Sequence, residues 1–454
     1  MKKFLAIDIG ASSGRHIVGS LKDGRITAEE VYRFPNGNKE QDGHLVWDVK
    51  NLFEQVKRGI AEAVRRYGKI DSLSIDTWAV DYVLMNGEEE ILPCYAYRDG
   101  RTAEVIPAVH GIVPFEELYA RTGIQFQPFN TVYQLYADKL AGRLEKATDY
   151  LMLPEYLLYK LTGVKASEYT NATSTGLVNA TTHEFDGDIL GKLGLPRTLF
   201  RPLTQPGAVL GRLKKEIAEE VGGDMDVVLC ATHDTASAVL SAPVGEGFET
   251  PYLSSGTWSL LGIEQPAAHT DGESRANNFS NEGGLNFTFR YQKNIMGLWM
   301  LQSVRKELGL GFADAEKLAR ANVCDAIVDC NDECFLAPHS MSEAIRDKAS
   351  ALSDGQLLYC IYNSLAHCYK QALDEMGKKL GRKFESLHII GGGSMDALLN
   401  ELTAKTANVC VIAGPTEATA LGNLLVQMVA GGEIRNIAEG REKILASFPL
   451  RQYK

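Results

Sequence analysis

A short run of small residues near the start of the chain has the composition of an anion-binding turn. An apolar stretch ends in the carboxylate of Asp8, and the run Gly10-Ala11-Ser12-Ser13-Gly14-Arg15 follows almost directly. Glycine lets a ligand approach the backbone closely and adopts the positive φ values of tight turns. A concave row of backbone N–H groups suits an anion. Because a carboxylate repels an anion unless a cation lies between them, this segment predicts a phosphate group held together with Mg²⁺.

The same segment also matches G-x-S-x-G, the nucleophile pattern of serine hydrolases, through Gly10, Ser12 and Gly14. That pattern requires a strand, a sharp turn and then a helix. Here β-branched residues follow and lead to Asp23-Gly24, a strong hairpin signal. The segment is therefore predicted to join two antiparallel strands, which argues against the hydrolase. The sequence contains no Walker loop, and a structural turn without a ligand stays open as an alternative.

A second polar group, His233-Asp234-Thr235, follows a buried strand expected at 227–230. A helix is expected to begin at this point. Asp234 can accept the proton of a hydroxyl group as a general base, or it can cap the helix, and the residues alone leave both open. Adjacent residues rarely form a working His–Asp dyad, so we expect the two side chains to point in different directions.

Three other groups of polar or small residues could contact a ligand. Gly391-Gly392-Gly393 lies between an expected strand and helix but lacks the third glycine and the acidic residue of a dinucleotide-binding turn. It predicts either the close approach of a nucleotide or a packing turn. Asn294 begins a helix-like run, as a cap or as a ligand contact. Asp76 and Asp81 end or interrupt apolar strands, and one of them could simply be solvated.

The chain has 454 residues, of which 45% are hydrophobic and 23% charged, with a net charge of −11. The length suggests two or three domains, and the negative charge argues against a broad nucleic-acid-binding face. We expect no signal peptide at the N-terminus, because a run of only four apolar residues precedes Asp8. No apolar run reaches the length of a membrane span, so we expect a cytoplasmic protein. The eight cysteines form no C-x-x-C pair and match no common zinc spacing. No segment indicates an obligate protein partner.

Strand and helix signals alternate along the chain, which favours an α/β fold. Helices are expected at 52–64, 131–161, 355–380 and lastly after Pro415, and strands at 73–78, 80–85, 387–390 and 409–412. The strand at 80–85 is expected to continue the strand at 73–78 or to pair with it. A boundary near residue 245 divides the chain into an N-terminal domain, 1–245, and a C-terminal domain, 246–454. The second half begins with an apolar strand and Ser254-Ser255-Gly256, which repeats the first turn and suggests two similar lobes.

Ten segments, in a single order, resemble the FGGY carbohydrate kinases from residue 4 to about residue 430. They are IDIGASSGR (7–15), IDTWAVDYVL (75–84), QFQPFNTVYQL (125–135), EYTNATSTGLVN (168–179), HDTASAV (233–239), YLSSGTWSL (252–260), NEGG (281–284), KNIMGLWMLQ (293–302), HIIGGG (388–393) and AGPTEATALGN (413–423). GASSGR in place of the G-T-S of sister kinases, together with HDTASA, points to the branch of the family that acts on L-rhamnulose.

The resemblance implies two ribonuclease-H-like domains of the actin and hexokinase type, with the active site in the cleft between them. It implies a kinase of L-rhamnose breakdown that uses ATP and Mg²⁺ to convert L-rhamnulose to L-rhamnulose 1-phosphate and ADP. A sister kinase acting on another ketose, such as L-fuculose or a xylulose, is the alternative. A non-catalytic sugar-responsive regulator and the serine hydrolase are less favoured.

The resemblance also implies roles for individual residues, carried over motif by motif. Asp8 holds Mg²⁺, and Asp234 is the proton acceptor. The implied ATP contacts are Ala11, Ser12, Ser13, Gly14, Arg15, Thr257, Gln302 and Gly392, and the implied sugar contacts are Ala79, His233, Asp234, Thr235 and Asn294. Ala79 departs from the family pattern, which often has glycine there, so a methyl group is expected at a backbone contact to the sugar.

Overall fold

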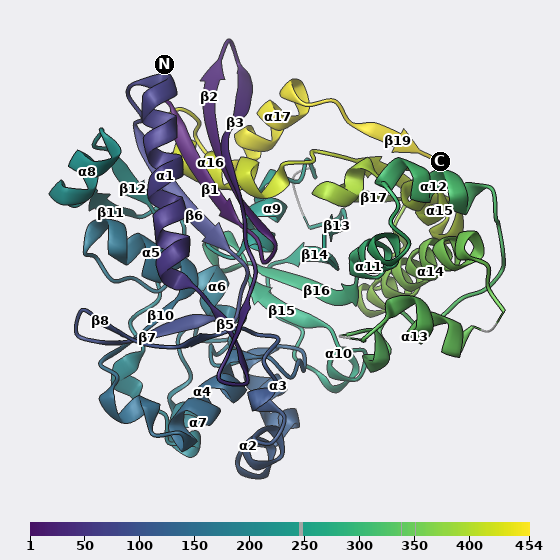
Figure 1. Ribbon diagram of the computed structural model, residues 1–454, viewed down its shortest axis with the longest axis horizontal. Coiled ribbons are helices and arrows are strands. Elements are labelled where there is room, and N and C mark those ends of the chain that lie inside the picture. The colour runs from purple at the N-terminus through teal and green to yellow at the C-terminus, as the bar shows by residue number, and fades with distance from the viewer. Residues whose placement is uncertain (245–247, 337, 350) are drawn as a thin grey trace. The chain divides into compact units, whose positions relative to one another are not determined.

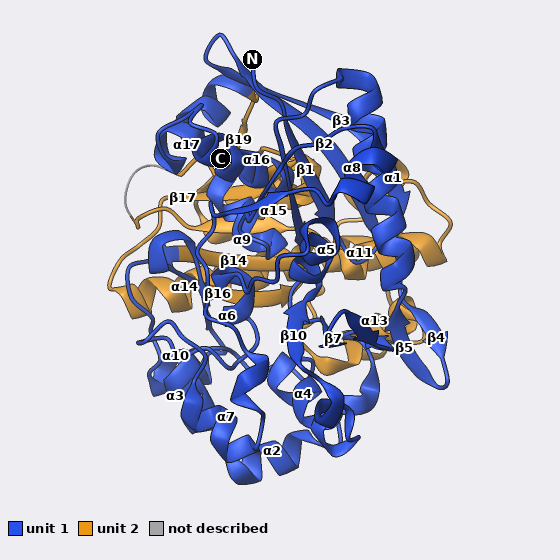
Figure 2. Ribbon diagram, turned by 90° about the vertical axis from the view of Figure 1, so that its left-hand side faces the viewer, with its two compact units in different colours: residues 1–241, 264–291, 419–447 blue, residues 242–263, 292–418, 448–454 orange. Residues whose placement is uncertain are grey.

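The computed structural model describes residues 1–244, 248–336, 338–349 and 351–454, which form two compact units (Figure 2). Unit 1 comprises Met1–Ser241, Glu264–Tyr291 and Thr419–Ser447. Unit 2 comprises Ala242–Ile263, Gln292–Ala418 and Phe448–Lys454. Each unit is therefore assembled from three segments of the chain. The domain boundary expected between residues 245 and 246 lies outside the described residues.

Unit 1 is built on a six-stranded mixed sheet in the order β11-β12-β6-β1-β2-β3 (Figure 1). Its strands are β1 (Phe4–Ile9), β2 (Ser13–Lys22), β3 (Arg25–Pro35), β6 (Ser72–Thr77), β11 (Val209–Arg212) and β12 (Asp226–Val228). β1 pairs antiparallel with β2 and parallel with β6. β2 turns into β3 at Asp23-Gly24, where both residues have positive φ. The predicted hairpin is confirmed, and no helix follows the Gly10–Gly14 segment, as the hydrolase pattern would require.

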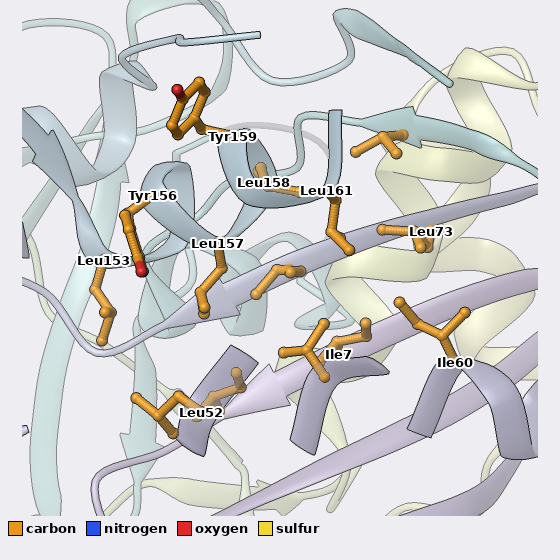
Figure 3. Close-up of a cluster of buried hydrophobic side chains, with 14 of the residues drawn as sticks. Ile7, Leu52, Ile60, Leu73, Leu153, Tyr156, Leu157, Leu158, Tyr159 and Leu161 are labelled. Atoms are coloured by element: carbon orange, nitrogen blue, oxygen red, sulfur yellow. The ribbon is translucent and has the colours of Figure 1, made fainter. Parts of the chain in front are cut away.

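The core of unit 1 joins this sheet to the helices α1 (Val49–Tyr67) and α5 (Leu153–Thr162) (Figure 3). Leu52, Val56 and Ile60 of α1 recur at a spacing of four residues and are buried, as the sequence pattern predicts. All six residues of β1 are buried as well. Burying each large aliphatic side chain contributes about 1.5–3 kcal/mol, so β1 is a well-anchored strand from which the first turn begins.

The rest of unit 1 contains two three-stranded sheets and a set of short helices. The small sheets are β4 (Lys39–Gln41), β5 (His44–Trp47) and β9 (Cys94–Tyr95), and β10 (Asp149–Met152), β7 (Tyr82–Asn86) and β8 (Glu89–Ile91). The other elements are α2 (Ile106–Ile112), α3 (Phe115–Thr122), α4 (Thr131–Leu140), α6 (Tyr169–Thr173), α7 (Gly187–Leu193), α8 (Lys215–Val221), α9 (Asp234–Ser241), α10 (Gly272–Ala276), β15 (Ser280–Gly283), α16 (Ala418–Ala430) and α17 (Ile437–Ser447).

Three expectations about these elements were wrong. Strand β7 neither continues nor pairs with β6, because it belongs to a separate sheet with β8 and β10. The helix expected over 131–161 is interrupted by β10, a strand of four residues that is too short to show a period of its own. The helix after Pro415, α16, is followed by α17 and a final strand, β19 (Arg451–Tyr453).

Unit 2 repeats the sheet of unit 1. Its strands are β13 (Tyr252–Ser255), β14 (Trp258–Gln265), β16 (Phe289–Met296), β17 (Ser386–Ile390), β18 (Cys410–Ala413) and β19. The seven-stranded sheet to which they belong also includes β15 and has the order β19-β18-β17-β13-β14-β16-β15. Along β19-β18-β17-β13-β14 the first pair of strands is antiparallel, the next two pairs are parallel and the fourth pair is antiparallel. The strands β11-β12-β6-β1-β2 of unit 1 pair in the same sequence of directions. The internal repeat that Ser254-Ser255-Gly256 suggests is confirmed for the two sheets.

Helices complete unit 2. They are α11 (Trp299–Glu307), α12 (Phe312–Arg320), α13 (Met341–Lys348), α14 (Asp354–Leu380) and α15 (Ala397–Ala407). The long helix α14 matches the helix expected at 355–380 and begins with a capping box between Ser353 and Gln356. In the part of the chain that the structure describes, no helix is both long and apolar enough to cross a membrane. All eight cysteines are free thiols.

We predict that Gly422→Ala destabilises unit 1. A Cβ atom at Gly422 of α16 would lie 1.7 Å from the backbone oxygen of Ser237 in α9. The two helices would have to separate, and overpacking of this kind costs about 1–3 kcal/mol. The measurement is the thermal transition temperature of the variant, which should fall by several degrees.

Gly191→Ala is the matched control for this prediction. Gly191 lies in α7 and no atom approaches its potential Cβ within 4 Å. Alanine favours a helix over glycine by up to about 1 kcal/mol, so this variant should be as stable as the unchanged chain or slightly more stable. Equal transition temperatures for the Gly422 and Gly191 variants would show that the close approach of α9 and α16 does not require glycine.

Candidate active site

The turn between β1 and β2 carries the predicted phosphate contacts. Ala11 and Ser12 lie in the turn itself, whereas Ser13, Gly14 and Arg15 already belong to β2. The turn is closed by a hydrogen bond from the N–H of Gly10 to the carbonyl oxygen of Ser13, at 2.9 Å. Ser12 is exposed at its tip. The structure therefore presents small residues at the end of a buried strand.

The two glycines of this turn serve a different purpose from the one expected. Neither Gly10 nor Gly14 has a positive φ, so the expectation of left-handed backbone here was wrong. A Cβ atom at Gly14 would lie 2.2 Å from the ring of Phe34 on β3. Gly14 is required by packing within the sheet, and Gly10 is the glycine with space beside it, because a Cβ there would meet only one oxygen, at 3.4 Å.

Two carboxylates meet at the end of β1. Asp8 of β1 and Asp76 of β6 are register partners on adjacent parallel strands. Arg15 donates from Nε to Asp8 Oδ2 at 3.0 Å. Both aspartates are buried, Asp76 completely, so the expectation that Asp76 or Asp81 is solvated was wrong for both residues, Asp81 being fully buried too. The register of the sheet thus places two acidic groups side by side.

A third carboxylate influences this pair. Burial raises the pKa of Asp76 well above its ordinary range, and the negative charges of Asp8 and Asp234 act in the same direction. The amide of Asn423, on α16, donates to Asp76 Oδ2 at 2.6 Å and opposes the shift. Asp76 Oδ1 has no hydrogen-bond partner among the described residues. Unit 1 therefore brings Asp8, Asp76 and Asp234 close enough to repel one another electrostatically.

Asp234 is the first residue of α9, and its side chain is 32% exposed. Its Oδ1 accepts the N–H of Thr235 at 2.5 Å and lies 3.2 Å from the Thr235 hydroxyl. A cap accepts an N–H two or three residues further along the helix, and here the carboxylate accepts from its direct neighbour. The geometry favours a carboxylate that faces outward over one that caps the helix.

His233 lies beside Asp234 after all. Its Nε2 is 3.3 Å from Asp234 Oδ1, and its Nδ1 is 3.1 Å from Oε2 of Glu282. The expectation that two adjacent side chains would point in different directions was wrong, because the chain changes from a strand-like bridge at His233 to a helix at Asp234. His233 is 6% exposed, so its imidazole is held inside unit 1 while the carboxylate of Asp234 reaches solvent.

A buried carboxylate pair holds the backbone that leads into this site. Thr232 donates from its N–H to Glu168 Oε2 at 3.0 Å, and its hydroxyl lies 2.9 Å from Glu168 and 3.0 Å from Glu155. The Thr232 carbonyl accepts the N–H of Thr77 at 3.0 Å. Burial raises the pKa of Glu155 to about 8, and the nearby Glu168 adds to the shift. The residue before His233 is thus fixed from two sides.

Ala79, the predicted sugar contact in the turn after β6, is part of a strained turn. Asp81 donates its N–H to the carbonyl oxygen of Ala79 at 2.9 Å across Val80, whose φ is 67°. A β-branched residue rarely adopts a positive φ, and such strain persists only where its surroundings enforce it. Here Thr131 donates to the Val80 carbonyl at 2.8 Å, and Trp78 donates to Asp81 Oδ2 at 2.8 Å.

Unit 2 gathers the predicted nucleotide contacts around the turn between β13 and β14. Thr257 lies in this turn, and its carbonyl accepts the N–H of Trp299 at the start of α11. Gln302 is one turn further along the same helix. Potential Cβ atoms at Gly391 and Gly393 would both meet Ser255 of β13, whereas Gly392 between them faces open space. Two of the three glycines serve packing, and the third is exposed.

Asn294, the remaining predicted sugar contact, lies in strand β16. The expectation that it begins a helix was wrong, because the apolar run around it covers the end of β16 and the start of α11 at Trp299. The predicted residues therefore form two groups. Unit 1 holds Asp8, Ala11, Ser12, Ser13, Gly14, Arg15, Ala79, His233, Asp234 and Thr235, and unit 2 holds Thr257, Asn294, Gln302 and Gly392.

Several polar residues next to this site were missed from the sequence. Asp76 was seen as a strand end without a role, and Glu168, Glu282 and Arg290 were given none. Their partners lie far away in the chain: Glu168 holds Thr232, and Glu282 and Arg290 surround His233. The available signal for Arg290 was a charged residue inside an otherwise strand-like run, which is rare unless the charge is paired.

Comparisons with known proteins identify the family of the chain. Residues 3–241 match the N-terminal domain of the FGGY family of carbohydrate kinases and residues 252–431 match its C-terminal domain, so the chain belongs to this family. It is 42% identical to a rhamnulokinase of Oceanobacillus iheyensis, over 99% of this chain and 97% of that protein. It is 43% identical to a rhamnulokinase of Halalkalibacterium halodurans, over 100% of this chain and 99% of that protein.

The fold is similar to that of a ligand-bound xylulose kinase from Lactobacillus acidophilus. The TM-score is 0.83 over 100% of this chain and 93% of that one, at 16% identity. The predicted two-domain α/β fold of the FGGY kinases is confirmed by the family match and by this likeness. The protein is a carbohydrate kinase, an enzyme that uses ATP to phosphorylate a sugar.

We predict that Glu155→Gln changes the pH dependence of stability. A carboxyl group whose pKa is about 8 in the folded state and near 4.5 in the unfolded state keeps its proton only when folded. Between these values the folded state binds more protons, so rising pH lowers the free energy of unfolding. In the variant this residue no longer lowers the free energy of unfolding as the pH rises. The transition temperature of the variant, relative to that of the unchanged chain, should therefore increase as the pH rises from about 5 to 8.

The measurement is thermal unfolding at several pH values. Glu54→Gln, on an exposed part of α1, is the control for the same exchange at the surface. A constant difference between the Glu155 variant and the unchanged chain across this pH range would contradict the assignment of a raised pKa to Glu155.

Proposed function

We propose that this enzyme transfers the γ-phosphoryl group of ATP to the 1-hydroxyl of L-rhamnulose and releases L-rhamnulose 1-phosphate and ADP. The observation that carries the proposal is the identity of 42–43%, over nearly the whole chain, to two proteins named rhamnulokinase. The reaction belongs to L-rhamnose breakdown. We propose the cytoplasm, where ATP is available, as the place of this reaction.

In this proposal the residues of unit 1 bind the sugar and the phosphates. The Asp234 carboxylate orients the 1-hydroxyl and accepts its proton, because its side chain reaches solvent at the start of α9. Thr235 fixes the carboxylate by donating its N–H to Oδ1. His233 and Ala79 contact the sugar, and Asn294 of unit 2 is a further proposed sugar contact. Phosphoryl transfer requires mainly positioning and neutralisation of charge, and these residues are held by buried contacts that provide the positioning.

The residues of the β1–β2 turn and of unit 2 would contact the nucleotide. Ala11 to Arg15 form a small-residue turn that a phosphate can approach closely. Thr257, Gln302 and Gly392 surround the equivalent turn of unit 2, and the exposed Gly392 has open space where a Cβ would be. A nucleotide can approach the backbone closely at such a position.

The acidic group at the end of β1 fits Mg²⁺. Asp8 and Asp76 are adjacent carboxyl groups, and burial with the charges of Asp8 and Asp234 raises the pKa of Asp76, so a cation would relieve their repulsion. Within the described residues, no three His, Cys, Asp or Glu side chains form a set that could hold a metal. Mg²⁺ is usually held by one or two carboxylates, waters and substrate phosphates, and we propose that Asp8 binds it, directly or through water. When bound, Mg²⁺ neutralises the charge of the phosphates.

A panel of ketoses tests the choice of substrate. L-rhamnulose, L-fuculose, D-xylulose and L-xylulose are each incubated with the enzyme, ATP and Mg²⁺, and ADP release is measured. We expect the highest kcat/KM for L-rhamnulose, and loss of activity when EDTA removes the divalent ion. A higher kcat/KM for another ketose would assign the enzyme to a sister activity of the family. ADP release that is independent of any sugar would contradict a kinase of sugars.

Asp234→Asn tests the proton acceptor. The amide keeps the shape of the side chain but accepts no proton, so kcat should fall by about 10² to 10⁴-fold. The fold should be retained, as judged by an unchanged thermal transition. Asp226→Asn, an exposed residue of β12 on the same stretch of chain, carries the same exchange outside the site and should leave kcat unchanged. Near-normal turnover of the Asp234 variant would limit this residue to a structural role at the start of α9.

A further inference from the structure

A fully buried arginine lies next to the proposed sugar site. Arg290, on β16, is 1% exposed. Its Nη2 donates to Oε2 of Glu282 on β15 at 3.0 Å, and its Nε donates to the carbonyl oxygen of Gly283 at 3.2 Å. Nη1 has no hydrogen-bond partner among the described residues. The hydrogen bonds of the guanidinium are therefore made by Nε and Nη2, which face Gly283, Glu282 and the group that Glu282 contacts.

That group is the imidazole of His233. Its Nδ1 lies 3.1 Å from Oε2 of Glu282 and 3.2 Å from Nη2 of Arg290. Its other nitrogen, Nε2, lies 3.3 Å from Oδ1 of Asp234. One ring thus connects a buried ion pair to the carboxylate that we propose as the proton acceptor. These residues all belong to unit 1, whose middle segment ends at Tyr291 and so includes the first residues of β16.

A buried ion pair of this kind is not explained by stability alone. Desolvation costs several kcal/mol for each ion, and apolar residues of similar volume often replace such pairs without loss. The pair does, however, determine how the imidazole can bind. A carboxylate accepts hydrogen bonds only and a guanidinium donates only, so the two groups make opposite demands on Nδ1. The proton distribution of the ring is therefore set by Glu282 and Arg290 together.

We propose that Glu282 and Arg290 are positioning residues that act through His233. They hold its imidazole with Nε2 directed at Asp234, and they fix which ring nitrogens carry a proton. This rests on the proposed function, because His233 and Asp234 are there the residues that bind the sugar and accept its proton. Glu282 and Arg290 lie on two strands and contact the imidazole of His233, and Arg290 also contacts the backbone at Gly283. These buried contacts hold the orientation of the imidazole before the sugar binds.

The test is a double-mutant cycle between Glu282→Gln and His233→Asn. Residues that act as one unit are not additive. Glu282→Gln alone should lower kcat/KM for the ketose about tenfold, a typical coupling between contacting residues, while the KM for ATP changes less than twofold. In the His233→Asn background the same exchange should have less than a twofold effect. If the loss of kcat/KM in the double variant equals the product of the losses in the two single variants, the proposal is overturned.

Glu264→Gln is the matched control. Glu264 also accepts a hydrogen bond from a partly buried arginine of unit 1, from Nη2 of Arg441 at 2.6 Å, and it does not contact His233. This variant should keep the kcat/KM of the unchanged enzyme. A tenfold loss here as well would attribute the effect of Glu282 to the general loss of a buried pair.

A spectroscopic readout separates this proposal from the choice of substrate. The chain has nine histidines, and the ¹⁵N signals of His233 are identified by their absence in His233→Asn. Glu282→Gln should shift the Nδ1 and Nε2 signals of His233, because the ring loses its carboxylate partner. Unshifted signals would overturn the proposal. This result is independent of which ketose the enzyme phosphorylates, whereas an inactive ketose panel would contradict only the proposed function.

A second variant covers the case in which Glu282→Gln does not fold. The double variant Glu282→Gln/Arg290→Met removes both charges and leaves no unpaired buried ion. It should fold and show the same tenfold loss in kcat/KM for the ketose. Normal activity of this double variant would overturn the proposal.

Discussion

The site in unit 1 depends on the mutual repulsion of carboxylates that the register of one sheet places together. Asp8 and Asp76 are partners on adjacent parallel strands, and the charge of Asp234 also acts on Asp76. A group of acids this close is unfavourable in an empty, buried site, and Arg15 and Asn423 compensate it only in part. The burial of every residue of β1 stabilises the sheet and offsets this repulsion. In the proposed function, this repulsion favours the binding of a divalent cation there.

In the proposed function Asp234 needs more than a position at the end of a strand, because a proton acceptor must be held within hydrogen-bonding distance of its substrate. The chain before it is fixed by Glu168, which accepts the N–H of Thr232. The residue beside it is fixed by Glu282, which lies 3.1 Å from His233. These contacts come from the N-cap residue of helix α6 and from strand β15, and so from distant parts of the chain. The exposed carboxylate stands on a backbone that has little freedom, which is the physical meaning of preorganisation.

Local patterns in the sequence predicted the turns and many of the elements, because hairpin residues, glycine and apolar periodicity act over short distances. The hairpin at Asp23-Gly24 and helix α1 are of this kind. Patterns failed where one run of residues covers two elements, as at Asn294, because only two residues separate the end of its strand at Met296 from the start of α11 at Trp299. They also failed where the determining partner is remote. The positive φ of Val80 depends on Thr131 and Gln134, and no short-range signal marks a valine for that conformation.

The repeated sheet separates the chemistry of the two units. The turns after β1 and β13 each begin with a glycine, Gly10 and Gly256, whose N–H bonds back to the following strand. Two residues before Gly10 stands Asp8, whose neighbour on the parallel strand is Asp76. Two residues before Gly256 stands Ser254, whose neighbour on the parallel strand is Ile390. The same backbone arrangement therefore carries two acids in unit 1 and two uncharged residues in unit 2. In the proposed function the cation and the proton acceptor belong with the acids, whereas a neutral turn can approach a polyanionic nucleotide without repelling it. One topology would then support both halves of a phosphoryl transfer.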